Sequence, residues 1–139
     1  MSKYRDQFRW SRRTDGQALV EFALASVLYF TLLFGIIQFG LATWQYNAMS
    51  DLAQVGARWA SVRGSTSTTP ANAAQLQTFV QGRSPGFTVT ATASPANPSA
   101  ALPGTSISVQ VVSTFAPVTL LLPFTTLNLS STATMVVSR

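Results

Sequence analysis

The sequence predicts an α+β fold, in which a long N-terminal helix with a transmembrane segment is followed by a small head. Three observations predict it. No charged side chain occurs from Phe22 to Ser50, apolar residues then recur at helical spacing as far as Val62, and apolar and polar residues alternate in the last third of the chain. A chain of 139 residues makes one modest domain. Its expected parts are a basic leader (1–16), the long helix (17–63) and the head (64–139).

The long helix is predicted to cross a membrane at about residues 18–42. A bilayer core needs roughly 20 apolar residues in a helix, and the charge-free run is long enough. A cleaved secretory signal has a shorter apolar region of about 7 to 15 residues, with small residues on its far side. Here the far side carries Trp44 and Tyr46, which are typical of the aromatic belt at a membrane surface. A retained span is therefore favoured over an export signal.

Most of the positive charge lies in front of the apolar run. Basic residues beside a span hold that flank in the cytoplasm, because moving them across the bilayer is unfavourable. This interpretation is favoured over a nucleic-acid footprint, so we expect the head to lie outside the cytoplasm. The expected topology residues are Lys3, Arg5, Arg9, Arg12 and Arg13.

Beyond the membrane the helix is predicted to continue to Arg63, with Gly64 and a serine- and threonine-rich loop as its stop. One face of this extension is apolar, and it either packs on the chain's own head or contacts neighbouring subunits. The residues of that face are Met49, Leu52, Val55, Trp59 and Val62.

The head is predicted to contain a short helix and about three strands. Thr69 as N-cap, Pro70 in the first turn and Gly82 as stop define a helix over 71–81. The strands should be mainly antiparallel, because their connections lack crossover helices. They are expected at 87–93, 106–112 and 127–137, with a loop over 94–104. An apolar segment from Phe115 to Phe124 either packs under the sheet, which is favoured, or forms a contact patch.

Several classes of function conflict with the composition. The chain has no cysteine and no histidine, which excludes disulfides, cysteine-rich metal sites and histidine-dependent catalysis. The head shows no aromatic cluster, acidic calcium loop or glycine-rich phosphate loop. We expect no enzymatic activity, no metal and no cofactor, since the acidic residues are too scattered for a paired-carboxylate hydrolase. They are Asp6, Asp15, Glu21 and Asp51.

Glu21 is the one charge at the start of the apolar run, and Gly16 lies five residues before it. Cutting after Gly16 would free the amine of Gln17, one helical turn from Glu21. That ammonium could pair with the carboxylate in the same chain or in a neighbour, neutralise it inside an apolar assembly and set the axial register of packed helices. Alternatively, Glu21 lies in the headgroup zone and needs no partner.

The stretch from Gly16 to Gly40, GQALVEFALASVLYFTLLFGIIQFG, resembles the N-terminal signature of TadE-like proteins. These are pilin-like components of tight-adherence (Tad, Flp-type) pilus systems within the type IV pilus superfamily. The resemblance implies a prepilin that a membrane aspartyl prepilin peptidase cuts after Gly16, with Gln17 as the first mature residue. It makes Glu21 and Phe22 the expected residues of assembly and register. Phe22 replaces the tyrosine of the small Flp major pilins, which favours a pseudopilin or minor pilin.

The resemblance implies a structural subunit that is assembled through its hydrophobic helix into a Tad or type IV-like pilus or its initiating complex. Its expected partners are the prepilin peptidase, other pilin subunits, the inner-membrane pilus assembly platform and the lipid bilayer, with no nucleic acid. We expect it in the bacterial inner membrane as a single-pass protein with a cytoplasmic N-terminus, and in an extracellular pilus after assembly. Two alternatives stay open: an unprocessed inner-membrane scaffold, and a secreted binding module with a cleaved export signal.

Overall fold

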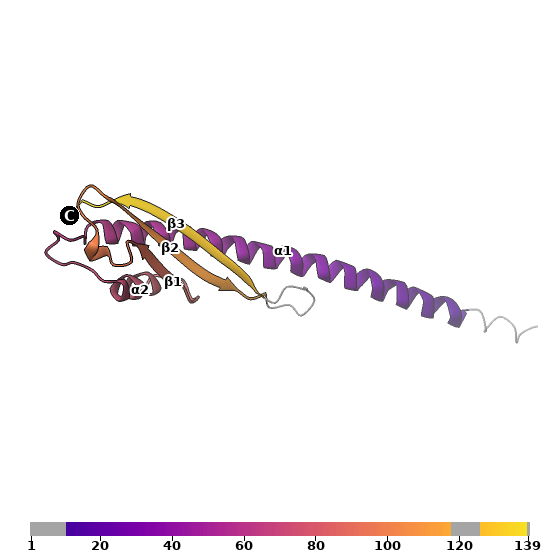
Figure 1. Cartoon of the computed structure of the whole chain (residues 1–139). Coiled ribbons are helices and arrows are strands. Elements are labelled where there is room, and N and C mark those ends of the chain that lie inside the picture. Colours follow the sequence, from indigo (N-terminus) through magenta and orange to yellow (C-terminus); the bar gives the residue numbers. More distant parts are fainter. Residues whose placement is uncertain (1–10, 118–125, 139) are drawn as a thin grey trace, which may run out of the picture. The chain divides into compact units, whose positions relative to one another are not determined.

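The computed structural model describes residues 11–117 and 126–138, with side chains from Gly16 onward. It confirms the predicted α+β fold, in which a long apolar helix precedes a short helix and an antiparallel sheet of three strands (Figure 1). The elements are α1 (Ser11–Ser61), α2 (Ala73–Gln81), β1 (Thr90–Ser94), a 3-10 turn (Pro98–Ala100), β2 (Ser106–Phe115) and β3 (Leu127–Val136). The described residues divide into two units between Gln38 and Phe39.

The hydrophobic core of the second unit is built on the C-terminal part of α1. Met49 and Leu52, two residues of the predicted apolar face, are buried in this core, whereas Val62 is exposed just beyond the helix end. Small residues make up the rest of the buried helix face, and we call Ala53, Gly56, Ala57 and Ala60 the helix seam. This part of α1 therefore packs on the chain's own head.

The helix seam lets the other elements approach α1 closely, and Gly56 is where the approach is tightest. A Cβ at Gly56 would lie 3.1 Å from Val80 Cγ2 of α2 and 3.3 Å from Val109 Cγ1 of β2. Both valines are buried. Gly56 is thus the point at which α1, α2 and β2 meet, and the missing side chain makes the contact possible.

Helix α2 begins at a different cap from the one that the sequence predicted. Asn72, and not Thr69, is the N-cap: its side chain accepts a hydrogen bond from Gln75 N at 2.9 Å, and Gln75 Oε1 accepts one from Asn72 N at 3.0 Å. This reciprocal capping box satisfies two backbone donors at once, and it needs a glutamine or glutamate at N3. Gln75 stands at N3 of Asn72, whereas Asn72 would stand at N3 of Thr69. The predicted end is confirmed, since Gly82 is the C-cap.

The sheet has the order β1-β2-β3, and both pairs are antiparallel as predicted. β1 starts at Thr90 and not at Phe87, and β2 extends to Phe115, three residues past its predicted end. The 3-10 turn lies in the predicted loop. Of the apolar segment from Phe115 to Phe124, residues 118–125 lie outside the described part of the chain, so its two alternatives stay open.

Polar contacts fix the direction of the strands relative to the C-terminal part of α1. Gln45 Nε2 donates to Ser113 Oγ at 2.9 Å, and Ser113 Oγ donates to the Thr88 carbonyl at 2.7 Å. At the other end of the sheet, Ser138 N donates to the Ser61 carbonyl at 2.9 Å. Because Ser113 pairs with Leu129, β3 runs from the Gln45 end to the Ser61 end, in the same direction as α1.

Replacing Gly56 by leucine should destabilise the head by about 1–3 kcal/mol, because the new side chain must displace Val80 and Val109 from a close-packed core. Chemical denaturation of the detergent-solubilised protein, followed by circular dichroism, measures the change. Gly40→Leu is the matched control, since nothing lies within 4 Å of a Cβ at that helix position. Equal stability of the two variants would contradict the packing described for Gly56.

Candidate processing and assembly site on helix α1

The predicted processing site lies inside helix α1. Because α1 begins at Ser11, the helix is continuous across the bond between Gly16 and Gln17. Both residues are exposed. A Cβ built at Gly16 would have no atom within 4 Å apart from its chain neighbours and the adjoining helix backbone. The bond is thus accessible within the described part of the chain.

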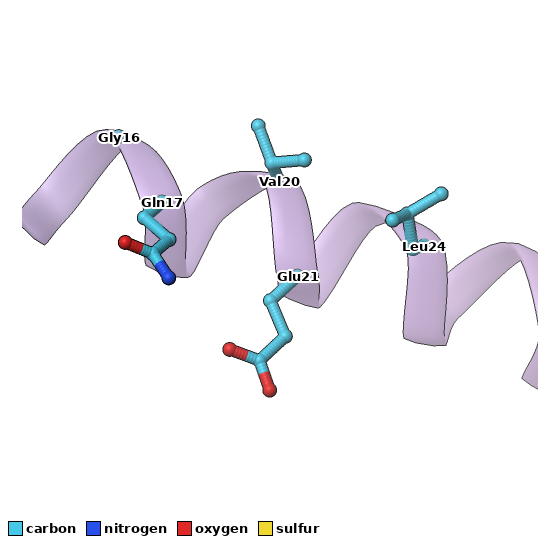
Figure 2. Close-up of a pocket in the computed structure, with 5 residues that line it drawn as sticks. All are labelled: Gly16, Gln17, Val20, Glu21 and Leu24. Carbon is cyan, nitrogen blue, oxygen red and sulfur yellow. The ribbon is translucent and has the colours of Figure 1, made fainter.

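Gln17 and Glu21 project from the same side of α1, one helical turn apart (Figure 2). Val20 and Leu24 lie beside them at the i+3 and i+7 positions, and these four residues together with Gly16 line a shallow, open depression on the helix. The juxtaposition of Gln17 and Glu21 is the one that the sequence predicted from helical spacing. Phe22, the other predicted assembly residue, is strongly exposed beside them.

The surroundings of Glu21 lack a cation from the helix that follows. Its side chain is exposed. From Gly16 to Ala57 the sequence contains no lysine or arginine, so this stretch offers no basic side chain to the carboxylate. Lys3, Arg5 and Arg9 lie outside the described residues, while Arg12 and Arg13 lie within α1 without described side chains. Cutting after Gly16 would place a new ammonium one turn from Glu21.

The helix surface that follows Glu21 is apolar on every side. Large hydrophobic residues from Leu19 to Tyr46 are exposed, including Phe22, Ile36 and Phe39 at more than 70%. In the described part of the chain, α1 is long and apolar enough to cross a membrane. A helix that is hydrophobic all round belongs in a protein core or in a membrane. This segment therefore indicates membrane anchoring or export.

One polar side chain in this segment escaped the sequence analysis. Gln38 is 7% exposed, and its Oε1 has no hydrogen-bond partner in the described structure. An unpaired buried amide oxygen costs roughly 1–3 kcal/mol, so its position within an apolar helix is unfavourable. In the sequence, the feature that could have drawn attention to Gln38 is its position as a single glutamine within a mostly apolar run.

Two aromatic residues and two arginines stack where α1 meets α2. Trp59 and Phe79 stack with ring centroids 4.7 Å apart, Arg63 lies 4.3 Å from the Trp59 ring centroid, and Arg83 lies 4.0 Å from that of Phe79. The repeated spacing, an aromatic residue four positions before an arginine, was the signal in the sequence. Cation–π contacts of this kind stabilise the junction of α1 and α2.

Residues 16–58 match the sequence model of the family described as TadE-like protein. The match begins at Gly16, includes Gln17, Glu21 and Phe22, and ends within α1. It confirms the resemblance found in the sequence: over residues 16–58 the chain is similar to TadE-like proteins. Comparisons with curated proteins and with solved structures gave no match.

Proposed function

We propose that this chain is a pilin-like structural subunit, a pseudopilin or minor pilin, of a Tad or type IV-like pilus or of the complex that initiates it. The family match over residues 16–58 carries the proposal, because it covers the apolar helix whose surface is exposed from Leu19 to Tyr46. A helix of this kind is stabilised by packing against lipid or against identical helices. The proposed role is structural and not enzymatic.

The proposed topology follows from the charge distribution. Lys3, Arg5, Arg9, Arg12 and Arg13 hold the leader, residues 1–16, in the cytoplasm. Residues of about 18–42 cross the inner membrane, and the head, residues 64–139, lies outside the cytoplasm. Its partners are the prepilin peptidase, the inner-membrane pilus assembly platform, other pilin subunits and the bilayer.

Processing is proposed at the bond between Gly16 and Gln17. A peptidase must hold the bond that it cuts in an extended conformation, so the helix around Gly16 has to unwind locally. Glycine lowers the cost of unwinding, because it is about 1 kcal/mol less favourable than alanine in a helix interior. A glycine before the cut site therefore serves recognition and also weakens the helix there.

Glu21 is proposed to set the register of assembled subunits. An isolated acidic side chain in the middle of a membrane helix costs about 3 kcal/mol, which disfavours burial of an unpaired Glu21 among apolar helices. The ammonium released at Gln17 would neutralise this charge from one helical turn away, in the same chain or in a neighbour. Because such pairing needs close contact, it favours one axial position of the helices over the others.

The mature protein is expected to begin at Gln17. Mass spectrometry of the intact protein extracted from membranes measures the N-terminus. Gly16→Leu should leave the precursor uncut, since a bulky side chain replaces the glycine before the cut site and strengthens the helix. Gly35→Leu is the control, because Gly35 is likewise open to its surroundings but lies away from the bond. A wild-type chain that still begins at Met1 would count against processing, and one that begins near Trp44 would support a secreted module.

Glu21→Gln should leave membrane insertion and cleavage unchanged but reduce the amount of protein in filaments sheared from cells, by roughly tenfold for each 1.4 kcal/mol lost. The substitution keeps the shape of the side chain and removes its charge. Immunoblots of the sheared and membrane fractions give the ratio. Asp51→Asn, which removes an exposed charge in the C-terminal part of α1, is the control and should assemble normally. Normal filament yield from Glu21→Gln would refute the register mechanism and leave the topology intact.

The second candidate is an unprocessed single-pass scaffold of the assembly machinery. A scaffold would keep its leader and stay in the membrane fraction after shearing, whereas a filament subunit would be released.

A further inference from the structure

The two edges of the sheet differ in whether side chains already occupy their outward-facing backbone groups. At the β1 edge, Gln77 and Gln81 of α2 bond to the backbone as a neighbouring strand would. Gln77 Nε2 donates to the Val89 carbonyl at 2.7 Å, and its Oε1 accepts from Ala91 N at 2.6 Å. Gln81 Nε2 donates to the Phe87 carbonyl at 3.3 Å, and its Oε1 accepts from Val89 N at 2.9 Å.

These two amides close the β1 edge to any further strand. Residues 87, 89 and 91 alternate along the chain, so the backbone groups that the glutamines satisfy are those that point away from β2. A fourth strand at this edge would have to displace both side chains and break four hydrogen bonds. The edge is thus covered by a helix, one of the ways in which proteins prevent unwanted pairing.

The β3 edge has no such cover among the residues that the structure describes. The backbone hydrogen bonds of β3 there are those to β2, and the bonds at the strand's end involve Val137 and Ser138. β3 is 10 residues long, and it contains no charged residue, no proline and no glycine. Charges, prolines, bulges and short length are the usual means of blunting an exposed edge, and β3 uses none of them.

The side chains of β3 indicate which kind of strand would fit beside it. Leu129, Ala133 and Met135 are half-buried and pack against the core on one face. The intervening residues are mostly hydroxyl-bearing and exposed on the other face. A fitting strand is uncharged, of similar length, and alternates between small apolar and hydroxyl-bearing residues. β3 itself has this pattern, and an antiparallel copy related by a two-fold axis through the sheet keeps like residues on like faces.

We propose that β3 is a homotypic docking edge, which pairs antiparallel with β3 of a second copy so that one sheet continues across two heads. Backbone hydrogen bonds supply the attraction, as in other cases of strand addition. The absence of charge on β3 leaves no repulsion between identical strands. The β1 edge, closed by Gln77 and Gln81, takes no part.

The direction of β3 limits which copies can pair. β3 runs in the same direction as α1 between Gln45 and Ser61, so antiparallel pairing makes these parts of the two α1 helices antiparallel. The pairing itself does not rest on the proposed function.

Disulfide trapping in the full-length protein in detergent tests the proposal, because the chain contains no cysteine of its own. Cα atoms directly opposite in an antiparallel pair lie about 4.5–5.5 Å apart, within the range that a disulfide bridges. Thr132→Cys and Ser130→Cys, made one at a time, probe two registers of the β3 edge, because only the residue on the two-fold axis lies opposite its own copy. Thr92→Cys and Thr90→Cys are their controls, exposed residues of the same cross-strand rows at the β1 edge.

Under mild oxidation, one of the two β3 variants is expected to give disulfide-linked dimers at several times the yield of either β1 variant. Association through the apolar part of α1 alone would raise both yields equally, and equal yields would overturn the proposal. The assay requires neither cleavage nor filament assembly, so its outcome is independent of the proposed function.

Thr132→Lys provides a second measurement without cross-linking. It places two ammonium groups close together across the two-fold axis near the middle of β3, and like charges on facing strands destabilise a strand pair. Dimerisation should weaken by roughly tenfold for each 1.4 kcal/mol of that repulsion, as measured by analytical ultracentrifugation in detergent. Thr92→Lys should leave it unchanged, and circular dichroism verifies that both variants fold. A wild-type protein that stays monomeric, or equal weakening by both lysines, would overturn the proposal.

Discussion

The apolar surface of α1 is the constraint on which the rest of this protein depends. From Leu19 to Tyr46 its large side chains are exposed on every side of the helix, and no polar face allows the segment to rest against water. The segment must therefore be surrounded by lipid or by other helices. The basic residues that precede it in the sequence and the family match that begins at Gly16 are both consistent with such surroundings.

The same helix changes character after Gln45. Its helix seam replaces large side chains with alanine and glycine, so the sheet and α2 can approach closely and enclose a core of Met49, Leu52 and residues from the sheet. The buried contact of Gln45 with Ser113 anchors one end of β2 to the helix, and Ser61 with Ser138 anchors the strand end that follows β3. A small domain without disulfides depends on such close packing for its stability.

Sequence patterns predicted this architecture because the spacing of apolar residues reflects the burial of hydrophobic surface, which is its main stabilising contribution. Hydrophobic length predicted α1, and alternation predicted the three strands in order. Finer features depend on tertiary partners that no local pattern reveals. The N-cap is Asn72 because Gln75 completes its hydrogen bonds. Pairing of β1 with β2 begins at Thr90, and just before it the Thr88 carbonyl accepts a hydrogen bond from the Ser113 side chain. At the candidate site, helical spacing alone placed Gln17 and Glu21 on one side of α1, whereas the burial of Gln38 and the stacking of Trp59 on Phe79 needed the folded chain.

The most direct test of the account is the access of water to α1 in intact cells. A single cysteine introduced by Leu32→Cys, in a chain that has none, can be challenged with a membrane-impermeant maleimide and compared with Ser67→Cys in the head. The account predicts that cysteine 67 reacts from outside the cytoplasmic membrane, while cysteine 32 reacts only after the protein is denatured. Rapid labelling of cysteine 32 in the native protein would show that the apolar surface faces water, and it would contradict the account.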